Sequence, residues 1–140
     1  MMKLRLLTAA IALLMIITGC HGKSSNDRGS DNPEELGKRV IEAFKNNDFN
    51  SYQASIATGT PEQNKKLFDH VRQELESHGL SNWSKMEFAR VSYGSNFSMF
   101  RIEFNYGTDY WGAMSLNGAD TVNGKYFLSH AYDDAGMIRR

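Results

Sequence analysis

The chain has 140 residues, of which 41% are hydrophobic, and it carries 16 basic and 16 acidic side chains. A formal net charge of zero excludes the strongly basic surface that nucleic-acid-binding domains use, and the length suits one domain. A single cysteine, Cys20, excludes an intrachain disulfide and any metal site built from several cysteines.

The first part of the chain has the organisation of a secretory signal peptide. Lys3 and Arg5 precede an apolar run from Leu6 to Ile17 that contains neither charge nor proline. This run is too short for a transmembrane helix, which needs about 20 residues. A buried N-terminal helix is the alternative, but a polar segment follows at once, and this favours a signal peptide.

The end of this run, Ile17-Thr18-Gly19-Cys20, resembles the lipobox of bacterial lipoproteins. The resemblance implies that residues 1–19 are a signal peptide removed by cleavage before Cys20. It also implies a diacylglycerol thioether on Cys20 and an acylated new amino terminus, and several acyl chains give stable anchoring. His21 follows where an Asp tends to retain Gram-negative lipoproteins in the inner membrane. We therefore expect a lipid anchor in the cell outer membrane, with the protein facing the periplasm.

The mature chain is predicted to begin with a tether. Without the signal cations Lys3 and Arg5 it keeps 14 basic and 16 acidic residues, which gives no basic surface for nucleic acid or anionic lipid. Residues 20–32 hold the lipidated cysteine and a polar, glycine-containing stretch with no large apolar side chain. A flexible coil of about 12 residues would span roughly 20 Å. The folded domain is expected over residues 33–140.

Three helices are predicted in the first half of this domain. The first begins at Pro33, after Asp31 or Asn32 as the N-cap, and ends at residues 46–48. A short second helix is expected over residues 49–57. The third has Thr60 and Gln63 in a capping box and closes near Gly79.

From Ser84 the apolar spacing changes to strand-like alternation. The first strand is expected to place Glu87, Ala89, Val91 and Tyr93 on one face, and the second to place Phe100, Ile102, Phe104 and Tyr106 on one face. A third strand is predicted over residues 109–116 and a fourth over 125–132, and residues 133–140 show little pattern. The order predicts an α+β fold in which N-terminal helices pack on one face of a four-stranded antiparallel sheet.

The opening helix runs into an acidic turn, Ala43-Phe44-Lys45-Asn46-Asn47-Asp48-Phe49. With the order of elements over residues 33–132, it resembles small bacterial lipoproteins of the NTF2-like or cystatin-like group. The resemblance implies a curved sheet wrapped around helices. Some members bind small molecules in the cone between the two layers and a few are enzymes, but no catalytic motif of the group can be matched here.

The sequence offers no recognisable catalytic or metal centre. The four histidines are His21, His70, His78 and His130, and no pair has metal-ligand spacing. His130 either lines a cavity or lies half exposed on its strand. The chain has no nucleophile elbow, phosphate-binding glycine loop or dinucleotide fingerprint. We predict a non-catalytic protein without metal or cofactor.

Aromatic residues crowd the strand region, either as a packed core or partly as an exposed or cavity-lining patch. Four of them are candidate binding residues: Tyr106, Tyr110, Trp111 and Tyr126. Because adjacent strand residues face opposite ways, Tyr110 or Trp111 is expected on the outer face of the sheet.

Two hypotheses of function stay open. The first is a protein-interaction module with an envelope protein as partner, such as an envelope assembly factor, an inhibitor or an immunity protein. The second is an NTF2-like lipoprotein that binds a small molecule in a cavity between sheet and helices. An exposed aromatic on the sheet favours the first, and an open cavity favours the second.

Overall fold

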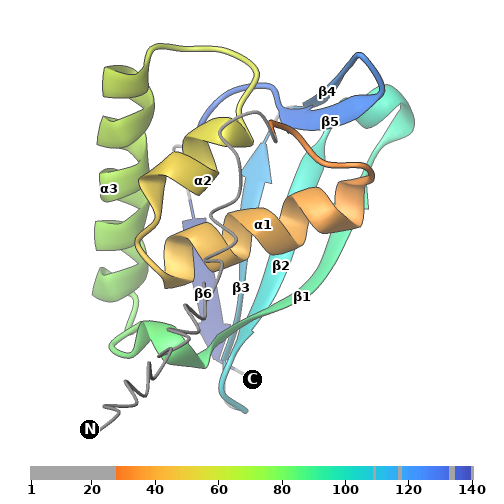
Figure 1. Ribbon diagram of the computed structural model, residues 1–140. Helices are drawn as coiled ribbons and strands as arrows, with labels where there is room; N and C mark the ends of the chain where they lie inside the picture. The colour runs from red at the N-terminus through yellow and green to blue at the C-terminus, as the bar shows by residue number, and fades with distance from the viewer. Residues whose placement is uncertain (1–27, 109, 117, 133–134, 140) are drawn as a thin grey trace, which may run out of the picture.

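The computed structural model describes residues 28–108, 110–116, 118–132 and 135–139. Three helices form a layer over one face of a four-stranded antiparallel sheet (Figure 1), which confirms the predicted α+β class. The predicted signal peptide, Cys20 and His21 lie outside the described residues. Within those residues no helix is long and apolar enough to cross a membrane.

The three helices begin at the predicted residues. In α1 (Pro33–Lys45) the Asn32 side chain accepts a hydrogen bond of 2.8 Å from the Glu35 amide. In α3 (Pro61–Ser77) Thr60 and Gln63 form the expected capping box. Helix α2 (Phe49–Ala54) ends three residues earlier than predicted, because residues 55–57 leave the helix to pair with Leu128.

The main sheet has the order β1-β2-β3-β6, from β1 (Met86–Tyr93), β2 (Phe100–Tyr106), β3 (Tyr110–Leu116) and β6 (Ala135–Arg139). A strand was predicted over residues 125–132 as the fourth of this sheet. Residues 125–128 do form a strand, but its predicted place in the main sheet is wrong. Residues 119–122 and 125–128 form a separate hairpin, β4 (Ala119–Val122) with β5 (Lys125–Leu128). Asn123 and Gly124 have φ of 51° and 75°, the left-handed pair that closes a two-residue hairpin. The fourth strand is instead the tail, paired with β3.

A β-bulge in β1 changes which residues share a face. The pairing with β2 shifts between Phe88 and Arg90, so the predicted alternation of Glu87, Ala89, Val91 and Tyr93 is broken at Ala89. Phe88 and Val91 therefore both face α1, where a Cβ added to Gly37 would lie 2.7 Å and 2.5 Å from them. Gly37 lets the helix approach the sheet this closely.

The space between the two layers is filled by side chains. Phe44, Tyr52 and Phe68 contact one another with ring centroids 4.6–5.0 Å apart. The Tyr52 hydroxyl accepts a 2.8 Å hydrogen bond from the Tyr132 amide. The fully buried side chains from both layers include Leu36, Val40, Ile41, Val71, Leu75, Met86, Phe100, Ile102 and Phe104. The described side chains thus occupy the region where the second hypothesis requires a cavity.

Gly112 offers a test of this packing. A Cβ there would lie 2.2 Å from the Phe104 ring and 2.7 Å from the Gly136 carbonyl oxygen, whereas a Cβ on Gly136 meets nothing within 4 Å. We expect Gly112→Ala to lower the free energy of unfolding by about 1–3 kcal/mol through overpacking. Gly136→Ala, the matched control on the neighbouring strand, should change it by less than about 0.5 kcal/mol. Urea denaturation measures both, and equal effects would contradict this packing.

Candidate functional site

Two of the predicted binding residues face the helices. Tyr106 is 8% exposed, and its hydroxyl accepts hydrogen bonds of 3.1 Å and 2.9 Å from the amides of Ser81 and Asn82. Tyr110 is half buried, with its ring 6.4 Å from that of Tyr106. Tyr106 therefore ties the chain after α3 to the sheet.

The other two predicted binding residues, Trp111 and Tyr126, lie on β3 and β5. Trp111 pairs in the backbone register with Asn105 and Ile138, and its side chain lies outside the described part of the structure. Tyr126 is half buried on β5, within the aromatic surface described below. His130 is exposed beyond β5. Over the described residues no three His, Cys, Asp or Glu side chains gather closely enough to hold a metal ion.

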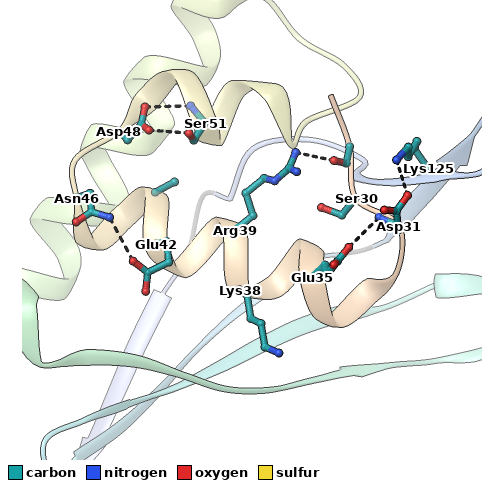
Figure 2. Close-up of a pocket in the computed structure, with 12 residues that line it drawn as sticks. Ser30, Asp31, Glu35, Lys38, Arg39, Glu42, Asn46, Asp48, Ser51 and Lys125 are labelled. Atoms are coloured by element: carbon teal, nitrogen blue, oxygen red, sulfur yellow. Dashed lines mark hydrogen bonds and ion pairs between the residues drawn. The ribbon is translucent and has the colours of Figure 1, made fainter. Parts of the chain in front are cut away.

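A polar groove of about 580 Å³ follows the outer side of α1, away from the sheet (Figure 2). Its walls are α1, the start of α2, the segment Gly29–Asp31 and Lys125 of β5. Side chains of both charges line it. The acidic ones are Asp31, Glu35, Glu42 and Asp48, and the basic ones are Lys38, Arg39 and Lys125. This groove was not predicted from the sequence, because it forms only when the segment before α1 folds back along the helix and pairs with β5, which brings in the distant Lys125.

The segment Gly29–Asp31 forms a wall because it is paired with β5. The Ser30 amide donates to the Tyr126 carbonyl at 3.0 Å, and the Tyr126 amide donates to the Ser30 carbonyl at 2.8 Å. Arg39 donates to the Gly29 carbonyl, and Asp31 forms an ion pair with Lys125 (Figure 2). Residues 28–32, predicted as the end of a flexible tether, are therefore part of the packed domain.

Most polar groups of the groove already have partners within the wall. Glu35 accepts a hydrogen bond of 3.2 Å from the Asp31 amide, and Asn46 donates one of 3.2 Å to Glu42. The Ser30 hydroxyl is an exception, because the residue is 2% exposed and the oxygen has no hydrogen-bond partner. The groove thus presents a firm polar surface, unlike the mainly apolar pockets that take small molecules.

Asp48 caps α2 at one end of the groove. The Ser51 hydroxyl donates to its carboxylate at 2.6 Å and the Ser51 amide at 3.1 Å, and these hydrogen bonds lower the pKa of Asp48 below its ordinary value of 3.8.

The lowered pKa of Asp48 predicts a pH dependence of stability. The stabilisation it gives is complete above the ordinary carboxyl pKa and is lost as the pH falls below about 3.8 through the folded-state value. In Asp48→Asn the amide oxygen still accepts from the Ser51 amide but does not titrate. We expect the stability advantage of the wild type over Asp48→Asn, from denaturation at several pH values, to shrink between about pH 5 and pH 2. A constant difference would contradict the role of the charged cap.

A second surface feature is a row of aromatic rings at one end of the sheet. Tyr93 and Phe97 have ring centroids 5.0 Å apart, and Phe97 and Tyr126 have centroids 5.3 Å apart. Tyr93 is 52% exposed, and Met99 in the same loop is 53% exposed. Of these residues only Tyr126 was predicted as a site residue, although the predicted turn at Gly94 marks the loop that brings Phe97 to it.

The loop between β1 and β2 holds Phe97 in an unfavourable conformation. Asn96 and Phe97 have φ of 54° and 55°, in the left-handed region. That region costs about 1–2 kcal/mol per residue, and a bulky aromatic residue is rarely found there. The conformation places the Phe97 ring between Tyr93 and Tyr126, and strained residues of this kind concentrate at functional surfaces.

Comparisons with known proteins found no match. No protein-family model matches the chain, and searches of curated proteins and of solved structures found no significant similarity. Inference about function therefore rests on the residues of this chain.

Proposed function

We propose that this protein is a lipoprotein anchored through Cys20 in the cell outer membrane, facing the periplasm, and that it is a non-catalytic protein-interaction module. The lipobox-like Ile17-Thr18-Gly19-Cys20 supports the anchor, as does the cationic and apolar segment before it. Envelope assembly factors, inhibitors and immunity proteins are the classes that fit such a module.

The observation that carries the interaction role is the polar groove along α1. Side chains of both charges line it, and its walls are held by the hydrogen bond from Arg39 to the Gly29 carbonyl and by the ion pair between Asp31 and the distant Lys125. Fixed charges of both signs favour a partner surface of complementary pattern and disfavour other partners.

The acids of the groove support a binding role over a catalytic one. Asp48 caps α2, and Glu35 accepts a hydrogen bond from the Asp31 amide. The Asp31 carboxylate forms an ion pair with Lys125. These carboxylates hold local structure, whereas catalytic carboxylates act as an acid and base pair around a reacting group.

The small-molecule hypothesis receives no such support. It places the ligand between sheet and helices, where buried side chains such as Phe44, Phe68 and Phe104 fill the space. The NTF2-like or cystatin-like resemblance stays a hypothesis about the fold and adds no ligand.

Lipidation is tested at Cys20. Intact-mass measurement of the mature protein should show cleavage before Cys20 and a mass increase from diacylglycerol and the amino-terminal acyl chain. Cys20→Ala removes the only thiol, so the protein should remain uncleaved by the lipoprotein peptidase and take up no labelled palmitate. Wild-type protein without palmitate would refute the anchor.

The groove is tested with two acids in similar settings. Glu42, on the groove, is 56% exposed beside Lys45, and Glu62, on α3, is 82% exposed beside Lys66. A photo-crosslinking amino acid at position 42 should capture one envelope protein in cells, and the same group at position 62 should not. Glu42→Lys should weaken binding of that partner by about tenfold, or about 1.4 kcal/mol. Glu62→Lys is the control, and capture from position 62 alone would place the interaction elsewhere.

A further inference from the structure

The large apolar side chains that the described residues expose most gather at one end of the molecule. They are Tyr93 at 52%, Met99 at 53% and Val122 at 47% exposed. Tyr93 and Met99 flank the loop between β1 and β2, and Val122 lies at the tip of the β4–β5 hairpin. Figure 1 shows this loop beside that hairpin, and the contact of Phe97 with Tyr126 joins the two. We call these five residues the aromatic end.

The chain enters the described domain at this same end. Ser30 pairs with Tyr126, and the Arg28 guanidinium lies 5.8 Å from the centroid of the Phe127 ring. Arg28 also donates to the Ile56 carbonyl at 2.9 Å, which fixes the start of the segment. Cys20 precedes Arg28 by eight residues, and eight residues reach at most about 29 Å in any conformation. Acyl chains on Cys20 would therefore keep Arg28 within about 29 Å of the bilayer, which leaves the aromatic end within reach of the lipid.

Strand β5 separates the aromatic end from the groove. Lys125 and Tyr126 are neighbours on β5, so their side chains leave opposite faces of the strand. Lys125 lines the groove, and Tyr126 contacts Phe97. When the aromatic end contacts another surface, the groove therefore stays accessible on the opposite face of β5.

We propose that the aromatic end, formed by Tyr93, Phe97, Met99, Val122 and Tyr126, rests in the interfacial layer of the membrane that holds the lipid anchor. This inference rests on the proposed acylation of Cys20. Tyrosine suits that layer because its ring is apolar and its hydroxyl stays hydrated, and Phe, Met and Val contribute apolar surface. The left-handed conformation of Phe97 sets its ring at this surface in advance. Lipid is the partner we infer, because the proposed acyl chains on Cys20 keep this surface near a bilayer.

The test uses the full acylated protein in vesicles of phosphatidylethanolamine with a minor share of phosphatidylglycerol. The Cys20 sulfur is occupied by its thioether, so Met99→Cys provides a single thiol for a nitroxide label. Lys66→Cys on α3, whose side chain is 76% exposed, is the matched control. Electron paramagnetic resonance then compares the access of oxygen, which concentrates in lipid, with that of a water-soluble nickel chelate.

The ratio of oxygen access to nickel access should be several-fold higher at position 99 than at position 66. Tyr93→Asp in the Met99→Cys protein should lower the ratio toward that of position 66, with an unchanged near-ultraviolet circular dichroism spectrum. Equal ratios in protein whose mass shows the acyl chains would overturn this inference and leave the anchor intact. Exclusion of both reagents from position 99 would indicate a second protein copy and also overturn it. A mass without acyl chains would instead refute the proposed anchor itself.

Discussion

Strand β5 connects parts of the chain that are otherwise far apart. It pairs with β4 along its length, with Ser30 through Tyr126, and with the residues after α2 through Leu128. Its successive side chains reach different regions: Lys125 the groove, Tyr126 the aromatic end, and Leu128 the buried core. Without this strand, neither the groove wall nor the aromatic end would have a fixed position. Both proposed surfaces therefore depend on one short strand.

The helix layer is fixed by close approach and by buried aromatic rings. Gly37 brings α1 against Phe88 and Val91, and the Phe104 ring lies over Gly112. Arg72 of α3 donates to the Phe44 carbonyl at the end of α1, and its guanidinium lies 3.8 Å from the Trp83 ring centroid. These contacts give the groove a rigid floor, since α1 cannot shift without disturbing the core.

The two proposals together describe a protein oriented by its anchor. The segment that leads to Cys20 enters at the aromatic end, and the groove lies on the opposite face of β5. A surface that rests on lipid and a separate polar groove would let the protein stay on the membrane while a partner binds. Orientation and recognition would then be separate tasks of neighbouring residues.

The sequence by itself determined the features that depend on near neighbours in the chain. The capping box of Thr60 and Gln63, the starts of the helices and the alternation of β2 are local patterns, and all were predicted correctly. The lipobox-like Ile17-Thr18-Gly19-Cys20 is also a local pattern, and together with the cationic and apolar segment before it this motif is the support for the proposed anchor. Only the tertiary structure decided the bulge at Ala89, the placement of residues 135–139 in the sheet and the separate β4–β5 hairpin.

The candidate site was decided by tertiary structure almost entirely. Tyr126 was named from the sequence, but its partners Phe97 and Ser30 are distant in the chain and no local pattern links them. Gly29–Asp31 has the composition of a flexible linker, yet pairing with β5 buries Ser30 and builds the groove wall. Composition reports how a segment behaves alone, whereas hydrogen bonds to a distant strand decide whether it is ordered in the folded protein.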